Sequence, residues 1–510
     1  MQSVYDIFII GGGINGTGIA RDAAGRGLRV GLAEMNDLGG ATSSASTKLF
    51  HGGLRYLEFF EIGLVRKALI EREVLLRAMP HISWPMRFVL PLHKDMRFEG
   101  GTPTSRILSM VMPWMKGRRP DWLIRLGLFL YDNLGGREIL PATSSIDLTK
   151  GPEGAPLKGK FRRGYEYSDC WVEDARLVAL NARDAAMRGA DVFARHKVTD
   201  ARRVDDVWSV TVEGPDGPKV VKAKNLVNAG GPWVEHVVRE HLDLDPTEGV
   251  RLVRGSHIVT RKLFDHDKSY FFQGEDGRII FAIPYETDFT LIGTTDAEHN
   301  DLNEAPYATQ AEQDYLIAFA NQYFEAQIAG DDIVWTYSGV RPLYDDNAKS
   351  ATAATRDYVL TLNDDGPPLL NIFGGKITTY RKLAENALKK LGFDDIWTAG
   401  VPLPGGDFAV ADRDNLVARL QSDYSFLTDR WALRLIRAYG TDAWSVLGRA
   451  QSVSDLGADF GATLTAKEVD HLMAHEFAQT AEDVVWRRSK LGLRLSQDQI
   501  SILDDYMTTR

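Results

Sequence analysis

The sequence feature that most constrains the fold is a glycine-rich turn close to the start of the chain. It follows an expected strand at residues 4–10, and Gly11, Gly13 and Gly16 fit the pattern G-x-G-x-x-G. Glu34 ends the next expected strand, 18 positions after Gly16. In such a unit the glycines permit a tight turn, the approach of a pyrophosphate to the backbone, and close packing of helix on strand. The helix start offers free N–H groups to the phosphates, and the acidic residue accepts hydrogen bonds from a ribose. The pattern therefore predicts a dinucleotide-binding unit.

Size and composition narrow the class of protein. A chain of 510 residues is too long for one hydrophobic core, so we expect two or three domains. The net charge of -10 argues against general nucleic-acid binding, which needs a basic surface. The single cysteine, Cys170, excludes an internal disulfide, an iron–sulfur cluster and a cysteine-rich zinc site.

No signal or transit segment precedes the first strand, and no apolar run reaches the roughly 18 residues of a membrane span. We expect a cytoplasmic protein, or one on the cytoplasmic face of a membrane.

Later segments repeat the strand-then-glycine form of the first unit. Residues 225–231 and 369–375 both end in paired glycines, which predicts that they return to the first sheet. Residues 250–296 alternate in the manner of antiparallel strands, and the Pro/Gly cluster at 402–406 is the best linker candidate. Other expected elements are helices at 62–79 and 174–188, strands at 191–194, 207–212, 278–284 and 289–293, and an irregular stretch at 100–160.

These elements predict an α/β plus α architecture. The expected parts are a discontinuous Rossmann-like nucleotide domain at 1–80, 160–235 and 365–395, an inserted antiparallel β-rich substrate domain at 81–159 and 236–364, and an all-α C-terminal domain at 405–510.

The glycine motif alone does not distinguish FAD from NAD, but longer motifs resemble those of FAD-linked, aerobic-type glycerol-3-phosphate dehydrogenases. The resemblance covers nearly the whole chain, and it implies the amino-acid-oxidase-like group of flavoproteins, with a nucleotide domain of the glutathione-reductase type. It is carried by residues 41–58, 166–171, 254–259, 337–343, 355–358, 373–382 and 486–492.

The resemblance assigns residues to an FAD site. Besides the glycine motif with Asn15, and Glu34, it implies that Ser46, Lys48 and Leu49 lie beside the flavin, and that Val198, Ala229 and Gly230 line the adenosine and pyrophosphate end. Gly375, Lys376, Ile377 and Thr378 stand between a strand and a helix. The helix start and the Lys376 ammonium would favour negative charge on the reduced flavin and so raise its potential.

The implied substrate is sn-glycerol 3-phosphate, a small dianion with a secondary alcohol. Its phosphate needs cations, and arginine donates bidentate hydrogen bonds to such groups. The matching motifs supply Arg55, Arg341 and Arg356 for binding, with Tyr56 as a phenol donor. The implied reaction removes the C2 hydroxyl proton and transfers a hydride from C2 to N5 of FAD, giving dihydroxyacetone phosphate.

The catalytic groups expected are His51, His257, Arg341 and Lys376. Histidine titrates near neutral pH, so either histidine can accept the alcohol proton, and the choice between them stays open. Arg341 can also lower the effective pKa of the alcohol. The resemblance further implies that electrons pass to a membrane quinone, either ubiquinone or menaquinone.

The segment 104–134 combines tryptophans, methionines and leucines with five cations against one anion between residues 106 and 125. Apolar residues beside a basic cluster suit an interfacial element on anionic lipid, which predicts peripheral binding to the cytoplasmic face of the inner membrane. The alternative is ordinary core with solvated arginines. Packing, homodimer formation and partner contact are the open roles of the C-terminal helices.

Three other readings stay in competition. A flavin amino-acid oxidase of the same fold would act on glycine, sarcosine or D-amino acids, and its substrate carboxylate also calls for an arginine. A soluble NAD-dependent dehydrogenase and a flavin-binding regulatory protein without turnover are the other two. His471 and His475 do not form an H-E-x-x-H motif, because position 479 is Gln, so no metal is expected.

Overall fold

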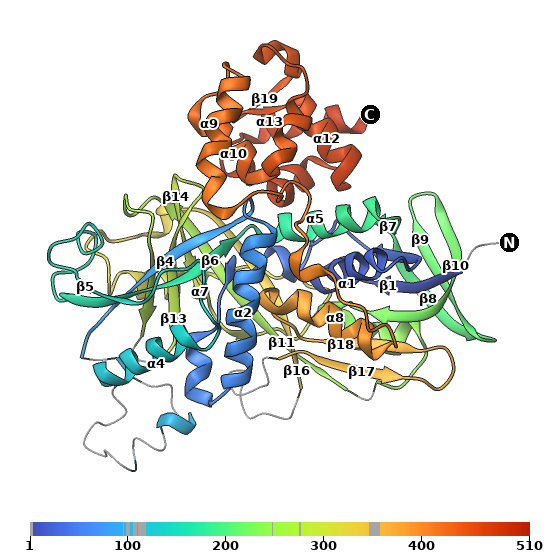
Figure 1. Cartoon of the computed structure of the whole chain (residues 1–510), viewed down its shortest axis with the longest axis horizontal. Helices are drawn as coiled ribbons and strands as arrows, with labels where there is room; N and C mark the ends of the chain where they lie inside the picture. The colour runs from blue at the N-terminus through green and yellow to red at the C-terminus, as the bar shows by residue number, and fades with distance from the viewer. Residues whose placement is uncertain are drawn as a thin grey trace.

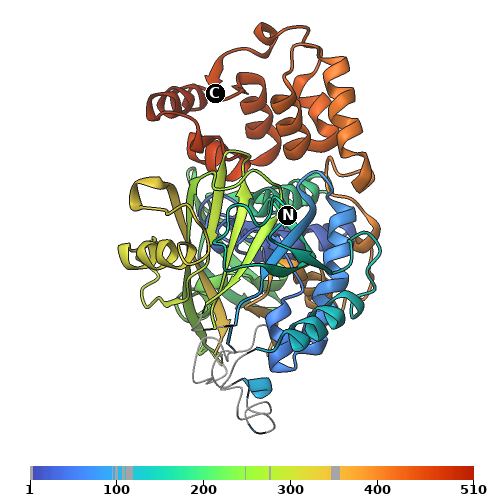
Figure 2. The same ribbon diagram turned by 90° about the vertical axis from the view of Figure 1, so that its left-hand side faces the viewer.

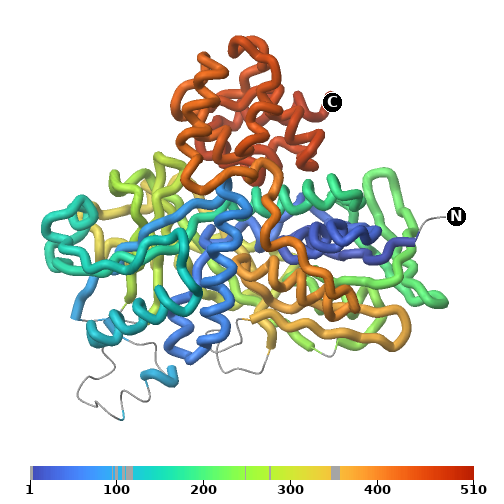
Figure 3. The backbone as a smooth tube through the Cα atoms, in the orientation of Figure 1, coloured from blue at the N-terminus to red at the C-terminus, as the bar shows by residue number. Residues whose placement is uncertain are grey.

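A computed structural model describes residues 4–94, 96–97, 102–105, 110, 119–246, 248–274, 277–345 and 357–510. Two sheet-based bodies lie side by side, and the C-terminal helices form a third body against one end of both (Figures 1 and 2). The chain contributes early, middle and late segments to the body that contains β1, which Figure 3 shows as blue, green and orange lengths of the same tube. The nucleotide-type body is therefore discontinuous along the sequence.

The first sheet has eight strands in the described part of the chain, with the path β17-β18-β10-β1-β2-β7. Strands β18, β10, β1, β2 and β7 run parallel, whereas β8 and β9 form an antiparallel extension on β10. The bounds are β1 Tyr5–Ile10, β2 Val30–Glu34, β7 Asp191–Ala194, β8 Lys197–Val204, β9 Val207–Gly214, β10 Gly217–Asn228, β17 Val359–Asn363 and β18 Leu369–Phe373. The central strands are continuous apolar runs, as expected for parallel strands covered on both faces.

Three helices cover one face of this sheet: α1 (Ile14–Gly25), α5 (Asp174–Met187) and α8 (Tyr380–Lys390). Helix α1 packs directly against both α5 and α8. The turns that lead into α1 and α8 lie at the carboxyl ends of β1 and β18, and β10 ends beside them. In an open parallel sheet this edge is where nucleotide ligands bind.

The second sheet has ten strands in the described residues, with the path β15-β11-β14-β13-β12-β4-β6-β3. Strand β16 adds to β11 and β5 adds to β6; most pairs are antiparallel. The bounds are β3 Leu49–Phe50, β4 Ser83–Pro91, β5 Ser144–Asp147, β6 Arg163–Val172, β11 Val250–Arg261, β12 Ser269–Gln273, β13 Ile279–Tyr285, β14 Phe289–Gly293, β15 Ala297–Glu298 and β16 Ile333–Tyr344. Helices α2 (Ile62–Ala78), α4 (Asp121–Asn133) and α7 (Gln310–Ala320) complete this half of the molecule, whereas the short α6 (Val234–His236) contacts β18 of the first sheet.

The C-terminal body has its own apolar core, separate from those of the two sheets. It contains α9 Arg413–Asp423, α10 Asp429–Tyr439, α11 Ala443–Leu447, α12 Ala466–Glu476, a π-helical segment Asp483–Arg488 and α13 Gln497–Thr508. A two-stranded hairpin, β19 Asp459–Gly461 with β20 Leu464–Thr465, interrupts the helices. The expected all-α domain is therefore helical except for one short hairpin.

The observed elements differ from the expected organisation at three places. β6 pairs along β4 and belongs to the second sheet, although residues 160–235 were expected in the nucleotide domain. β17 pairs with β18 and belongs to the first sheet, although 236–364 was expected in the substrate domain. Helix α4 lies within the stretch expected to be irregular. The partner of β6, strand β4, is distant in sequence, so a local pattern cannot assign β6 to its sheet, whereas β17 pairs with the next strand along the chain, β18.

Cys170 lies in β6 and is fully buried, which raises the pKa of its thiol. Among the helices that the structure describes, none has the length and apolar character needed to cross a membrane.

Candidate active site

One cavity of about 640 Å³ lies where the glycine turns of the first sheet meet the edge of the second. Most of the residues expected at the cofactor and substrate sites line it together. They include Gly11, Gly13, Asn15, Glu34, Ser46, Leu49, His51, Tyr56, Val198, Ala229, Gly230, His257, Arg341, Gly375, Lys376, Ile377 and Thr378. Gly16, Lys48 and Arg55 are not in the lining, and Arg356 lies outside the described residues.

The first glycine turn is too crowded for any other residue type at two positions. Gly11 has φ +105°, and a Cβ there would lie 2.5 Å from the carbonyl oxygen of Ala229. A Cβ on Gly16 would lie 1.9 Å from the carbonyl oxygen of Gly11. Gly16 thus lies beneath the cavity and shapes the turn above it, so its absence from the lining agrees with a packing role.

Glu34 joins the second strand to this turn. Its Oε2 accepts a hydrogen bond from the Gly12 N–H at 2.7 Å, and its Oε1 accepts one from the Asn36 N–H at 2.8 Å. Burial raises the pKa of Glu34, and these two N–H groups oppose the rise. A carboxylate has about four lone-pair sites, so acceptor capacity remains for a ribose hydroxyl.

Loop 41–47 crosses from the first sheet to the second and covers the start of α1. The Ile14 N–H donates to Ser43 Oγ at 3.0 Å, and Thr42 Oγ1 donates to the Val340 carbonyl at 2.6 Å. A Cβ on Gly339 would lie 2.8 Å from the Cβ of Ala45, so the glycine lets the loop approach β16. The two sheets are therefore joined directly above the cavity.

Lys48 was expected beside the flavin, but its side chain is directed elsewhere. Its ammonium lies 2.6 Å from Asp174 Oδ1, and both side chains are fully buried. The Ser46 hydroxyl donates to Asp174 Oδ2 at 2.7 Å, so the same carboxylate anchors the cavity loop. The Lys48 side chain therefore braces the loop from outside the cavity.

A second glycine turn precedes α8 and faces the first. Asn15 Nδ2 donates to the Gly374 carbonyl at 3.1 Å, and Gly375 has φ +103°. Asn15 Oδ1 is buried and has no hydrogen-bond partner in the described residues. A buried, unsatisfied oxygen between two glycine turns is typical of a site that a polar ligand completes.

Lys376 and Tyr56 meet at this side of the cavity. The Lys376 ammonium lies 3.6 Å from the centre of the Tyr56 ring, which is a cation–π contact. The His51 N–H donates to Thr378 Oγ1 at 3.3 Å, which ties the loop after β3 to the start of α8. Burial and the charges of Lys376 and Arg72 lower the pKa of His51 to about 4.

Arg341 and His257 come from adjacent strands of the second sheet. Arg341 Nη2 donates to Thr294 Oγ1 at 3.0 Å, and Nη1 pairs with Asp296. A Cβ on Gly255, two residues before His257, would lie 2.2 Å from Arg341 Nη2. Gly255 therefore leaves room for the guanidinium of Arg341.

The His257 ring is held on three sides. Its Nε2 lies 3.0 Å from Thr47 Oγ1, and the ring stacks on Tyr337 with centroids 4.6 Å apart. Gly293 is opposite it in β14, and a Cβ there would lie 2.1 Å from the ring. Burial, with the charges of Arg341 and Lys48, lowers the pKa of His257 well below its usual range. His257 is therefore a neutral imidazole at neutral pH.

Sequence reasoning missed several residues of this site. Thr47 and Asp174 hold His257 and Ser46, and Asp296 neutralises Arg341. Asn36 and His196 line the cavity beside Glu34. Asn36 follows the second strand by two residues, so its position was a usable signal. No local pattern marks Asp174 or Asp296, because their partners lie far along the chain.

Comparisons with known proteins agree with this arrangement. Residues 6–381 match the family model of the FAD dependent oxidoreductases, and residues 396–508 match that of the C-terminal domain of alpha-glycerophosphate oxidase. Glycerol-3-phosphate dehydrogenase of Pseudomonas aeruginosa is 47% identical over 99% of this chain and 96% of its own length. D-erythritol 1-phosphate dehydrogenase of Brucella abortus is also 47% identical, over 96% of this chain and 95% of its own.

Among solved structures, the glycerol-3-phosphate dehydrogenase of Bacillus halodurans complexed with FAD superposes with a TM-score of 0.71 at 24% identity, and it covers 99% of this chain and 94% of its own. That likeness shows the fold. The cavity, the two glycine turns and the unsatisfied Asn15 oxygen fit a dinucleotide of this kind. The chain belongs to the FAD-dependent oxidoreductase family, and FAD is its cofactor.

Proposed function

We propose that this protein oxidises sn-glycerol 3-phosphate to dihydroxyacetone phosphate and passes the electrons to a membrane quinone. The observation that carries the proposal is that one cavity joins the FAD-binding turns to Arg341, Lys376 and a neutral histidine. The names of the full-length relatives support a phosphorylated polyol as the substrate. They do not favour the alternative of an amino-acid oxidase.

Different side chains of the cavity contribute separately to the oxidation of the alcohol. Bound FAD supplies a hydride acceptor for C2 of the substrate. Arg341, a planar fork held by Thr294 and Asp296, offers N–H donors to the phosphate or to the developing alkoxide. Lys376 adds a second positive charge beside the Tyr56 ring. The Lys376 Nζ atom is itself buried, which strengthens its attraction for an anion.

His257 is the base that we propose. A base must be unprotonated to accept the C2 hydroxyl proton, and burial beside Arg341 keeps this imidazole neutral. Thr47 and the Tyr337 ring fix its orientation. This favours it over His51, whose hydrogen bonds with Thr378 are made by its backbone. Replacing each histidine by asparagine tests the choice: the base should lose more turnover than the other, with FAD retained in both.

Flavin bleaching tests the reaction class. Oxidised flavin absorbs visible light and loses that absorbance on reduction. Under anaerobic conditions, sn-glycerol 3-phosphate should bleach the holoenzyme, whereas glycine, sarcosine and D-amino acids should not. Bleaching by an amino acid, with no response to the phosphate ester, would reverse the proposal. A flavin that stays oxidised with every substrate would indicate a binding protein without turnover.

The substrate test needs a second polyol phosphate. The relative named D-erythritol 1-phosphate dehydrogenase is as similar to this chain as the one named glycerol-3-phosphate dehydrogenase. Values of kcat/KM for both esters therefore decide the substrate. We expect sn-glycerol 3-phosphate to give the higher value, and a higher value for D-erythritol 1-phosphate would reassign the substrate while leaving the reaction class intact.

The quinone and membrane part of the proposal rests on an exposed apolar surface. Trp122 and Phe129 on α4 are 55% and 61% exposed, and Leu126 lies between them. Helix α4 contacts the short 3-10 helix Leu54–Phe59, which carries Tyr56 into the cavity. The apolar surface and the cavity are thus separated by one short element. The rest of the segment 104–134, including Trp114 and its basic neighbours, lies partly outside the described residues.

A vesicle assay tests this surface. The triple variant Trp122→Ser, Leu126→Ser, Phe129→Ser should lose binding to phosphatidylglycerol vesicles and reduction of added quinone, while the flavin still bleaches with substrate. A matched control changes three other exposed apolar residues that lie outside this surface: Met187→Ser, Ile396→Ser and Ile502→Ser. Equal vesicle binding by both triple variants would reject the surface.

A further inference from the structure

The Glu34 end of the FAD cavity is built from two separate segments, Glu34–Asn36 and His196–Val198, which line it side by side. The His196 N–H donates to the Glu34 carbonyl at 2.7 Å, and the Arg195 N–H donates to the Asn36 carbonyl at 2.9 Å. Glu34 in turn accepts from the first glycine turn. Any force that moves one segment therefore moves the other and the glycine turn with it.

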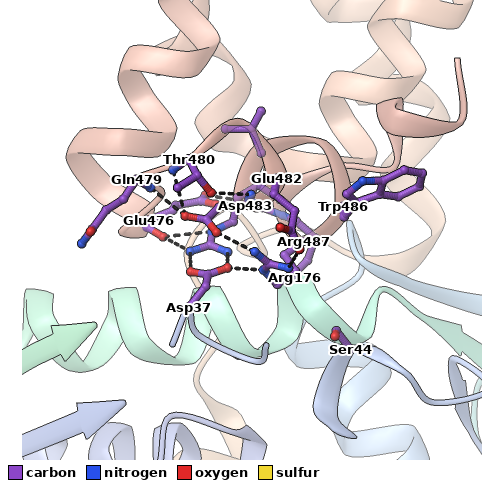
Figure 4. Close-up of polar contacts among 12 residues, drawn as sticks. Asp37, Ser44, Arg176, Glu476, Gln479, Thr480, Glu482, Asp483, Trp486 and Arg487 are labelled. Atoms are coloured by element: carbon purple, nitrogen blue, oxygen red, sulfur yellow. Dashed lines mark hydrogen bonds and ion pairs between the residues drawn. The ribbon is translucent and has the colours of Figure 1, made fainter. Parts of the chain in front are cut away.

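The C-terminal body reaches this end of the cavity through Asp37, the residue after Asn36. Asp37 is only 2% exposed, and Arg488 donates to both of its oxygens at 2.7 Å. Arg487 pairs with the same carboxylate through Nε. Figure 4 shows Asp37 pointing from the N-terminal segment into the C-terminal helices, where Arg487 meets it. Arg487 and Arg488, both in the C-terminal segment Asp483–Arg488, thus bind one buried carboxylate of the loop at residues 34–37, which we call the cofactor loop.

The same C-terminal segment also holds the second cavity segment. Asp483 is fully buried, and it accepts from Arg195 Nη2 at 2.8 and 2.9 Å. It also accepts from Arg487 Nη2 at 2.5 Å and from the Gln479 N–H at 2.8 Å. Burial alone would raise the pKa of Asp483, but these donors lower it to about 2. Asp483 therefore stays ionised. Residues 479–488 thus bind both segments of the Glu34 end, one through Asp37 and the other through Arg195.

We propose that the C-terminal body is part of the machinery that retains FAD, with Asp37, Asp483, Arg487 and Arg488 as positioning residues. These four do not line the cavity near Glu34, and they act through the loops they hold. A buried ion pair that loses one partner leaves an uncompensated charge, which drives the segment toward water. If only a fraction of molecules keeps Glu34 and His196 in place, the apparent affinity for FAD falls by that fraction.

The test compares two buried carboxylates at the same interface. Asp37→Asn removes the charge that holds the cofactor loop. Glu476→Gln is the matched control, because the fully buried Glu476 side chain pairs across the interface with Arg176. The contact of Glu476 with Arg488 is made by its backbone carbonyl, which the substitution keeps. For each full-length variant, the Kd of FAD and its release rate are measured by flavin fluorescence, and the melting temperature of the apoprotein is measured separately.

Asp37→Asn should raise the Kd of FAD by about tenfold or more, whereas Glu476→Gln should change it by less than about twofold, with both variants losing thermal stability. Equal changes in Kd for the two variants would overturn the proposal, because they would reduce the effect to general loosening of the interface. If Asp37→Asn does not fold, Arg487→Gln decides. It leaves Arg488 on Asp37, and it should raise the Kd a few-fold; an unchanged Kd would also overturn the proposal.

Discussion

The two ends of the FAD cavity are built in different ways. The end near Gly11 and Glu34 consists mainly of backbone, with glycines at points where a Cβ would collide with a carbonyl oxygen. The end near His257 and Arg341 consists of side chains from the adjacent strands β11 and β16, each held by a neighbour such as Thr47 or Asp296. We therefore expect changes at the first end to alter FAD affinity, and changes at the second to alter kcat/KM while FAD stays bound.

The largest effect is expected at Gly16. In Gly16→Ala the new Cβ would lie 1.9 Å from the Gly11 carbonyl oxygen, so the turn or the helix must shift. We expect the loss of detectable FAD binding, measured by visible absorbance of the purified protein. Gly63→Ala is the control, because a Cβ there meets nothing within 4 Å. Normal flavin content in Gly16→Ala would contradict the description of this end as rigid backbone.

Arg341→Ala should have the next largest effect. Arg341 is partly exposed, but removing one donor that stabilises developing negative charge typically lowers turnover on the order of 10²- to 10³-fold, so kcat/KM for sn-glycerol 3-phosphate should fall by about that factor. Flavin content should not change. Arg251→Ala is a close control, because Arg251 stands on the neighbouring strand, pairs with Glu298 and has the same 27% side-chain exposure. A similar loss of kcat/KM in both variants would show that Arg341 has no special role.

Gly293→Ala tests whether His257 must occupy one position. The added Cβ would meet the imidazole at 2.1 Å, and displacing a catalytic group by about 1 Å can cost on the order of 10²-fold in turnover. The Kd of FAD should stay the same, since His257 belongs to the substrate end. Steady-state kinetics with flavin quantitation checks both parts, and weaker FAD binding without a change in kcat would break the distinction between the two ends.

The smallest expected effect is in the pH profile. Because burial and nearby cations lower the pKa of His257 well below 6.5, and that of His51 to about 4, both imidazoles are unprotonated at pH 6. The value of kcat at saturating substrate should therefore stay level from pH 8 to 6 and fall only at lower pH, whereas kcat/KM also responds to the substrate phosphate, whose second pKa is about 6. An acid limb of kcat centred near 6.5 would mean that the base is an ordinary exposed group.

The lowered pKa of His51 also makes the free energy of unfolding depend on pH. In the unfolded chain His51 binds a proton below about pH 6.5, whereas in the folded protein it does so only near pH 4. The unfolded state then binds more protons, so the free energy of unfolding decreases as the pH falls from 6.5 towards 4.

The two ends also differ in how far the sequence predicts them. Gly11, Gly16 and Glu34 work through local backbone geometry, so a spacing pattern finds them. Arg341 and Lys376 also line the cavity, but only their likeness to family motifs singled them out, because arginine and lysine are common on surfaces. The sequence did not predict the contacts of residues whose partners lie far along the chain. Lys48 meets Asp174 from a segment 126 positions away, and nothing in its own neighbourhood indicates that contact.

Strand assignment follows the same rule. The first sheet places β1, β2 and β10 as their apolar runs predict, because each is a local signal. For β6 and β17, only the pairing with β4 and with β18 decides which sheet each strand joins. The order of strands is therefore the part of this fold that the sequence pattern leaves undetermined.

Cys170, buried in β6, has a practical consequence. It is the only cysteine of the chain, and a thiol shielded from water with a raised pKa reacts slowly with maleimides or iodoacetamide. The protein thus behaves in labelling chemistry as if it had no cysteine. A thiol introduced on α4, or on the C-terminal helices, would carry a fluorophore or spin label at one known position, without removal of any natural residue.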